Sequence, residues 1–229
     1  MEMLHRTPDT TAPKTELIRE QVYKALRAEI LTCNLRPGED LREKELAVRF
    51  EVSKSPVRDA LQKLEREGLV SVEPRQGYRV TPISLADAKE MFVFRAIIES
   101  GCIKEAVRNA SNIELQELDE FRKFSSTESI FDDFIIYNNN FHSSLAACSG
   151  NTRMATTLQT LIDHMGRLIY LSVSVIQGRA PQELVNEHCE IIDAMQNRNA
   201  RLASRLAKNH IEEAEKRVIK ALGMNMISP

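Results

Sequence analysis

Hydrophobic side chains recur at helical spacing along most of the chain. Four of them, at positions 18, 22, 26 and 30, lie on one stripe of the segment 17–32, which predicts a first helix. Beyond residue 83 the same spacing continues, and Gly, Ser and Asn interrupt it at short junctions. About six further helices are predicted there, over residues 84–108, 113–124, 130–148, 152–176, 181–196 and 201–222. A run of helices with no strand signal between them predicts an antiparallel all-α bundle.

Two shorter helices are predicted between these regions. Residues 43–50 place three apolar side chains on one face and charged side chains on the other. Residues 51–56 interrupt this helix, with serines that can cap a new N-terminus and a proline that the first turn of a helix tolerates. The second helix ends at Gly68, and its apolar positions are Val57, Ala60, Leu61 and Leu64.

Two β-prone runs follow the second short helix, at residues 69–72 and 78–81. The five residues between them, Glu73 to Gly77, have hairpin turn chemistry, and Arg75 gives the turn a basic tip. Three helices followed by a two-stranded wing is the order of a winged helix-turn-helix domain. The sequence therefore predicts a mostly α protein with such a domain at its N-terminal end.

The N-terminal end of the second short helix carries Lys54, Ser55 and Arg58. A B-form major groove admits one helix, whose N-terminal residues reach base edges while flanking groups hold phosphates. A lone cationic helix is more often a solvated face. The short partner helix and the basic hairpin, at the spacing of a winged domain, favour DNA binding instead.

Several segments of this region carry a longer motif without gaps, at residues 35–41, 45–47, 52–61, 64–70 and 76–78. Together they resemble the N-terminal domain of GntR-type bacterial transcription regulators. The DNA contacts that the resemblance implies are Lys44, Lys54 and Arg58, with Ser53 at a phosphate or cap position and Gln76 and Gly77 in the minor groove. The two lysines stand where the family most often has arginine, and lysine lacks the planar fork that pairs with guanine.

The composition and net charge of the chain indicate how it would bind DNA. The 229 residues are 42% hydrophobic and 28% charged, with a formal net charge of −2. Up to Pro82 there are 15 Lys and Arg against 14 Asp and Glu, or +1, and the remainder has 16 against 19, or −3. Neither part is strongly basic, so we expect local cationic surfaces and site-selective binding. We predict a flexible arm at 1–15, the winged domain at 16–82 and the helical domain at 83–229.

The cysteines and the absence of a long apolar run indicate a cytoplasmic protein with no membrane partner. The cysteines form no C-x-x-C pair, and three lie within apolar helical patterns, so buried reduced thiols are expected. Residues 1–14 have no signal-peptide core, and the longest apolar-rich run, 168–176, is too short to span a bilayer. The four cysteines are Cys33, Cys102, Cys148 and Cys189.

Histidines and an asparagine in the predicted bundle indicate a metal site. Asn138 and His142 are four residues apart, so they share one face of a helix. His188 and His210 lie eleven residues before and after Asn199, the centre of a turn, and an antiparallel hairpin brings such positions level. Neutral nitrogen donors with an oxygen donor suit Zn²⁺ first, and Ni²⁺ or another first-row metal next. A single buried histidine is more often a core residue, but the joint geometry favours a metal.

Segments of the helical region at 141–142, 147–151 and 187–194, together with His210, resemble the FCD effector domain of the FadR branch of GntR regulators. The family pattern has histidines at the positions of His142, His188 and His210, and usually aspartate where Asn138 stands. An asparagine carbonyl brings no charge, so the full charge of the metal would remain for an incoming anion. We therefore expect a small organic acid as effector.

Two arginines are candidates to pair with the carboxylate of that effector. Arg95 and Arg167 both lie among apolar residues of predicted bundle helices. Arg95 can equally pair with Glu99, four residues further on, as helix support. His164, near Arg167, is a further candidate for the lining of the cavity.

Three classes of function remain. A ligand-responsive regulator that binds a palindromic operator in double-stranded DNA as a homodimer is favoured, because two-fold sites call for two-fold proteins. Repression is the commoner mode in families of this kind, and activation is the alternative. A metalloenzyme would need an open metal position and a general base, but no carboxylate stands beside the histidines at a motif spacing. Non-specific architectural DNA binding would show no preference between sites.

Overall fold

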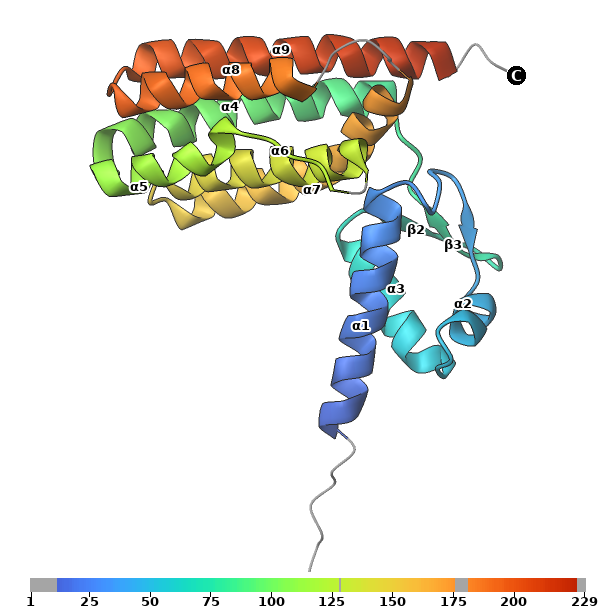
Figure 1. The fold of residues 1–229 in the computed structure, drawn as a ribbon. Helices are drawn as coiled ribbons and strands as arrows, with labels where there is room; N and C mark the ends of the chain where they lie inside the picture. Colours follow the sequence, from blue (N-terminus) through green and yellow to red (C-terminus); the bar gives the residue numbers. More distant parts are fainter. Residues whose placement is uncertain (1–11, 128, 176–180, 226–229) are drawn as a thin grey trace, which may run out of the picture. The chain divides into compact units, whose positions relative to one another are not determined.

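The computed structural model describes residues 12–127, 129–175 and 181–225. The chain divides into two compact units, Met1–Pro82 and Ile83–Pro229. Both units are mainly helical, and the only sheet among the described residues lies in the N-terminal unit (Figure 1). The mostly α fold predicted from the sequence is therefore confirmed.

The N-terminal unit is a winged helix-turn-helix domain. Its helices are α1 (Ala12–Leu31), α2 (Glu43–Arg49) and α3 (Lys54–Arg66), and its strands are β1 (Asp40–Leu41), β2 (Val70–Glu73) and β3 (Gly77–Val80). The strands form one antiparallel sheet in the order β1-β3-β2. Helix α1 packs along α3 (Figure 1). Fully buried apolar side chains join the elements into one core, among them Leu26, Ile30, Val57, Leu61, Leu64, Leu69 and Val80.

The structure corrects the predicted N-terminal unit in two places. Strand β1 pairs with β3 and was not predicted, because two residues are too few to show alternation. Helix α1 begins at Ala12, so residues 12–15, predicted to belong to a flexible arm, are helical. Pro13 lies in the first turn, where its missing N–H breaks no helical hydrogen bond. The rest of the predicted arm, residues 1–11, lies outside the described residues.

The wing depends on a glycine at the end of its turn. Glu73 pairs with Gly77 across the hairpin, and the Gln76 N–H donates to the Glu73 carbonyl oxygen at 3.0 Å. Gly77 has a φ of +112°, and a Cβ there would approach the Leu41 carbonyl oxygen to 2.9 Å. Only glycine combines that backbone conformation with so close a contact to β1.

The C-terminal unit is a helical bundle. Its elements are α4 (Leu85–Asn109), α5 (Asn112–Glu117), the 3₁₀ helix η1 (Leu118–Arg122), α6 (Ile130–Ala147), α7 (Thr152–Val175), α8 (Pro181–Gln196) and α9 (Ala200–Asn225). Helices α8 and α9 lie side by side, and so do α6 and α7 (Figure 1). No helix among the described residues is long and apolar enough to cross a membrane.

Serines cap the N-termini of two of the bundle helices. Ser84 accepts a hydrogen bond from the Asp87 N–H at 3.4 Å at the start of α4. Ser111 and Glu114 form a complete capping box at the start of α5. The helix predicted over 113–124 is not continuous, because after Glu117 the chain tightens into η1.

Candidate nucleic-acid interface and metal centre

The exposed side of α3 carries the residues predicted to contact DNA. Ser53, Lys54, Ser55 and Arg58 are all exposed, while Val57 on the opposite side is fully buried. Ser53 occupies the N-cap position without a side-chain capping hydrogen bond, so its hydroxyl group is not used by the helix. The helix therefore presents its N-terminal polar groups outward, as a major-groove helix must.

Arg58 is held by the preceding helix. Its Nε and Nη2 atoms donate to the two carboxylate oxygens of Glu43 on α2 at 2.9 and 2.8 Å. The hydrogen bond from Arg58 lowers the pKa of Glu43, and the same bond raises the pKa of the Arg58 guanidinium. The Arg58 side chain is still 55% exposed. Helix α2 thus orients Arg58 without burying it, and Lys44 lies exposed on the same helix.

The wing presents its turn residues to solvent. Arg75 and Gln76 are exposed, and Gly77 is half-buried against β1. Arg75 adopts a left-handed φ of +66°, which a tight hairpin turn requires at this point. The basic tip that the sequence predicts is therefore accessible, and its minor-groove role stays a prediction.

Three histidines meet inside the helical bundle. His142 comes from α6, His188 from α8 and His210 from α9, and all three side chains are buried. One nitrogen from each imidazole lies within 4.8 Å of the others. The ring centroids of His188 and His210 are 4.9 Å apart, as their symmetric positions about Asn199 imply. The arrangement is one that could hold a metal ion.

Each imidazole uses its Nδ1 atom to bind a neighbouring oxygen. The partners are the Glu99 carboxylate for His142 at 2.8 Å, the Tyr137 hydroxyl for His188 at 3.1 Å and the Glu187 carboxylate for His210 at 2.7 Å. The Tyr137 hydroxyl donates to the Phe121 carbonyl oxygen at 2.6 Å, so it accepts from His188. These acceptors place the imidazole protons on Nδ1 and leave a lone pair on each Nε2.

The other ring nitrogen, Nε2, is the atom with which these histidines could bind a metal. Among the described residues, Nε2 of His142 and Nε2 of His188 are buried without a hydrogen-bond partner. Burial and the charge of Arg95 lower the pKa of His142 to about 4. Burial also lowers the pKa of His188, and it lowers the pKa of His210 although Glu187 opposes the shift. Neutral imidazoles with a lone pair on Nε2 are the form that binds a metal.

Arg95 pairs with Glu99, as the simpler of its two predicted roles requires. Its Nε donates to one Glu99 oxygen at 2.9 Å, while the other oxygen binds His142. Burial favours the neutral form of Glu99, but His142 and Arg95 outweigh it and hold its pKa below the ordinary value. The Arg95 Nη2 atom is buried without a hydrogen-bond partner in the described part of the chain. Its pairing with Glu99 therefore leaves one donor available.

A small cavity of about 30 Å³ adjoins His210. Its lining consists of Arg95, Phe134, Asn138, Ile169, Leu184, His210, Ala214 and Arg217. The structure thus brings Asn138 and Arg95 together with His210. Arg167, buried on α7, and His164, half-buried on the same helix, do not belong to this lining. Their predicted contact with an effector stays a prediction.

Sequence reasoning missed the oxygen partners of the histidines. Tyr137 and Glu187 each precede a residue of the predicted site in the chain, but their helices turn them toward other residues: Tyr137 binds His188 and Glu187 binds His210. Glu99 was predicted only as a partner of Arg95. Arg217, two turns after His210 on α9, was also missed, although its i, i+7 spacing places both on one face of that helix.

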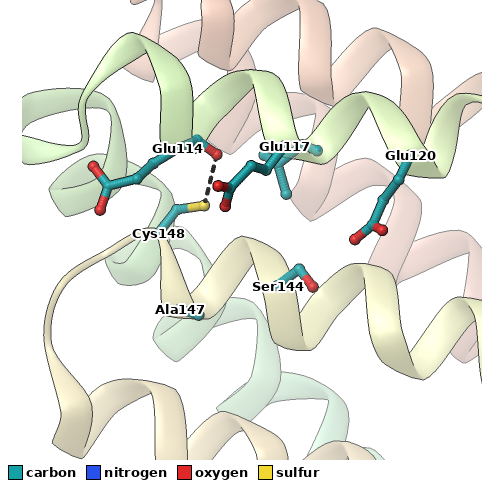
Figure 2. Close-up of a pocket in the computed structure, with 7 residues that line it drawn as sticks. Glu114, Glu117, Glu120, Ser144, Ala147 and Cys148 are labelled. Atoms are coloured by element: carbon teal, nitrogen blue, oxygen red, sulfur yellow. Dashed lines mark hydrogen bonds between the residues drawn. The ribbon is translucent and has the colours of Figure 1, made fainter.

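A second hollow of about 210 Å³ lies between α5, η1 and the end of α6 (Figure 2). Glu114, Glu117 and Glu120 line one side, and Cys148 lies opposite them. The Cys148 thiol donates to the Glu114 carbonyl oxygen at 3.5 Å. Burial and the nearby glutamates raise its pKa to about 11, so it is protonated and unreactive at neutral pH. All four cysteines are free, and Cys102 is fully buried.

Comparisons with known proteins agree with both units. Residues 18–80 match the family described as bacterial regulatory proteins, gntR family, and residues 90–213 match the FCD domain. The HTH-type transcriptional repressor RspR of Escherichia coli K12 is 29% identical over 93% of both chains. A transcriptional regulator of Streptomyces ambofaciens is 31% identical over 84% of this chain and 81% of its own.

A solved structure shows the same fold. A GntR regulator from Rhodococcus sp. RHA1 superposes with a TM-score of 0.73 at 22% identity, over 88% of this chain and 97% of its own. A winged helix-turn-helix domain in the same chain as a helical FCD domain defines a DNA-binding transcription regulator. The chain belongs to the GntR family of bacterial regulatory proteins and carries an FCD domain. Its relatives are regulators and not enzymes.

Proposed function

We propose that this regulator is a repressor whose operator binding is controlled by a small organic acid bound beside a divalent metal. The observation that carries the proposal is the convergence of three neutral imidazoles whose Nδ1 atoms are already bonded. Nitrogen donors of this kind suit Zn²⁺ first, and Ni²⁺ or another first-row metal second. Two relatives in Escherichia coli K12, RspR and GlaR, are named as repressors, which favours repression over activation.

The metal would be held by Nε2 of His142, His188 and His210, with the Asn138 carbonyl as an oxygen donor. Asn138 is buried and lines the cavity beside His210. The oxygens that bind the three Nδ1 atoms fix the orientation of the rings and raise their basicity. The metal, when bound, supplies a positive charge that attracts an anion.

Arg95 would bind the effector carboxylate through Nη2. This donor is buried and has no partner in the described part of the chain, and Arg95 is one of the residues that line the cavity. A carboxylate that accepts from it forms a charge-assisted hydrogen bond and satisfies a costly unpaired group. Arg95 therefore serves two carboxylates, Glu99 through Nε and the effector through Nη2.

The size of the cavity limits the effector. A volume of about 30 Å³ holds little more than a water molecule. An acid of several carbon atoms therefore requires half-buried side chains at the lining, such as Leu184 and Arg217, to move aside. Arg167 and His164 are proposed as contacts only for a ligand that extends along α7.

The DNA partner would be a palindromic operator bound by a homodimer. Lys44, Lys54 and Arg58 are exposed on α2 and α3, with Ser53 and Ser55 beside them, and Arg75 and Gln76 are exposed at the wing. Two copies of this surface related by a two-fold axis would read two half-sites. The alternative of an activator uses the same surface, so only transcription measurements separate the two.

Metal content tests the histidine site. The double variant His188→Ala with His210→Ala should lose the bound metal and retain its affinity for DNA, because the two substitutions lie in the helical unit. Elemental analysis of purified wild-type and variant protein, with Cys148→Ser as a control that keeps its metal, gives the answer. Equal metal content in the wild type and the double variant would refute the site.

The effector requires a screen. Small carboxylic acids added to Zn²⁺-loaded protein should raise the melting temperature when they bind the native state. An acid found in this way should lose its effect on Arg95→Met, which retains the length of the side chain but not its charge. A thermal shift that is unchanged in Arg95→Met would contradict the assignment of Arg95.

A further inference from the structure

A carboxylate lies within the surface that is predicted to contact DNA. Glu43 is the first residue of α2, and two predicted DNA contacts on α3 act on it. The hydrogen bond from Arg58 and the charges of Arg58 and Lys54 lower its pKa, so it is ionised at neutral pH. DNA presents a dense row of negative phosphates, which repel a carboxylate at this place whatever the base sequence. Glu43 can therefore favour an operator only through its effect on neighbouring side chains.

Glu43 occupies one edge of the Arg58 guanidinium group. Its two oxygens accept hydrogen bonds from Nε and Nη2 at 2.9 and 2.8 Å. A guanidinium has five N–H bonds, one on Nε and two on each Nη atom, so three remain. One of these on Nη1 and one on Nη2 point the same way from the end of the group. This second pair of parallel donors matches the O6 and N7 acceptors of a guanine.

The two partners of this ion pair differ in exposure. The Arg58 side chain is 55% exposed, and that of Glu43 is 21% exposed. Helices α2 and α3 pack against each other, with Leu46 and Val57 buried in the core of the winged domain (Figure 1). The carboxylate is therefore held on a packed helix while the guanidinium reaches solvent. Arg58 meets DNA with its direction already set, which reduces the side-chain ordering that binding would otherwise cost.

The other predicted cations on these helices cannot replace Arg58 in a forked contact. Lys44 and Lys54 are exposed, but a lysine ammonium is a point charge without a planar fork. Arg58 is the one arginine among the contacts predicted on α2 and α3. Recognition of a guanine by a forked contact from these helices therefore depends on Arg58 and on the edge that it presents.

We propose that Glu43 is a specificity-determining residue of this regulator: it binds the Nε–Nη2 edge of Arg58, so that the Nη1–Nη2 edge meets a guanine of the operator. Glu43 acts through Arg58 and touches no base. It also offsets one positive charge at the surface, which lowers the affinity for duplexes that lack this guanine. The inference rests on the proposed function, because it takes Arg58 as an operator contact.

Two affinities measured side by side test this role. Fluorescence anisotropy of the full-length protein compares an operator duplex, selected by the wild type from a random library, with a scrambled duplex of the same composition. Glu43→Gln removes the charge and keeps the shape of the side chain. The ratio of operator to scrambled affinity should fall roughly tenfold, because Arg58 then no longer presents a fixed edge. Affinity for the scrambled duplex should rise, and its logarithmic salt dependence should steepen by about 0.9.

Glu45→Gln is the matched control. Glu45 lies on the same helix, is 67% exposed and pairs with Arg42. Its substitution removes the same charge from α2 without touching Arg58, so the affinity ratio should keep its wild-type value. Glu43→Asp separates the charge from the fork, because it keeps the carboxylate but is one methylene shorter. It should lower the ratio and leave the affinity for the scrambled duplex unchanged. Circular dichroism checks that all variants remain folded.

A double variant shows whether Glu43 acts through Arg58. Adding Glu43→Gln to Arg58→Ala should leave the affinity ratio where Arg58→Ala alone puts it. A further fall of the ratio would overturn the inference, and so would a wild-type ratio in Glu43→Gln or an equal fall in Glu45→Gln. A wild-type ratio in Arg58→Ala is a different result: it would overturn the proposed operator contact itself, and this inference with it.

Discussion

At the scale of single residues, neighbouring side chains decide what each polar group can do. The same imidazole could be a proton donor to solvent, a core residue or a ligand. In the bundle, Glu99, Tyr137 and Glu187 take the Nδ1 atoms, and only Nε2 remains. In the winged domain, Glu43 likewise fixes the direction of Arg58 without removing it from solvent.

Arg58 should contribute both its charge and the planar geometry of its guanidinium group to DNA recognition. Arg58→Ala is expected to weaken binding to the specific operator by roughly tenfold to 100-fold, and Arg58→Lys should recover only part of this, because lysine cannot form two parallel hydrogen bonds with a base. Arg66→Ala, at the C-terminal end of α3, is the control. Fluorescence anisotropy with operator DNA measures all four proteins. If Arg58→Ala bound the operator with wild-type affinity, the assignment of Arg58 as a DNA contact would be wrong.

Tyr23 gives the winged domain a measurable pH dependence. Its hydroxyl donates to Glu67 at 2.6 Å, and burial together with that carboxylate raises its pKa from 10.0 to about 12. The folded pKa is above the unfolded pKa, so this stabilisation is present below pH 10 and is lost between pH 10 and 12. Tyr23→Phe should cost about 1 kcal/mol at pH 8 and much less near pH 12. Urea unfolding of wild type and variant across this range checks the difference, and a constant difference would argue against the hydrogen bond.

At the scale of elements, local patterns predicted most of the fold, and contacts between elements decided the rest. The apolar stripe of α3 and the turn at Glu73–Gly77 are local signals, and both elements are where they were predicted. Strand β1 exists only through its pairing with β3, so its two residues carry no signal of their own. Likewise α5 gives way to η1 where the chain packs against α8, which periodicity does not report.

In the histidine cluster, too, some features follow from local sequence signals and others only from contacts between helices. A tight turn between two antiparallel helices fixes which residues face each other, so the pairing of His188 with His210 could be predicted from their distances to Asn199. The contact of His142 with Glu99 joins α6 to α4, and no spacing within either helix predicts it. That is why the metal-type donors were found and their oxygen partners were not.

The free energy of unfolding should depend more on the glycine at position 77 than on the glycine at position 38. Gly77→Ala forces a Cβ to within 2.9 Å of the Leu41 carbonyl oxygen at a φ of +112°, and should cost about 2 kcal/mol or more. Gly38→Ala has a φ of +85° but no atom within 4 Å of the added carbon, so about 1 kcal/mol is expected. Chemical unfolding followed by circular dichroism compares the two. Equal costs would show that the contact with β1 is not tight.

At the scale of the whole molecule, the two units have separate chemistry. The N-terminal unit presents exposed cationic groups on α2, α3 and the wing, and the C-terminal unit holds a buried, neutral histidine cluster with an arginine donor. Because the overall charge is near neutral, we expect DNA affinity to come from specific contacts rather than from bulk attraction.

From this charge distribution we expect the protein to prefer a specific DNA sequence over other duplexes. The affinity for DNA upstream of the regulator's own gene should exceed that for a scrambled duplex of equal length at every salt concentration, with both affinities falling as salt rises. A salt series by fluorescence anisotropy measures this directly. Equal affinities for the two duplexes would indicate a non-specific architectural protein.

The most direct test of the account compares operator affinity with and without the acid selected by the thermal-shift screen. Wild-type protein and the His188→Ala, His210→Ala double variant are both titrated onto the same operator by fluorescence anisotropy. We expect the acid to weaken wild-type binding by roughly tenfold or more, in line with ordinary allosteric coupling, and to leave the variant unchanged. An acid that changes both proteins equally, or changes neither, would contradict control of DNA binding through the histidine cluster.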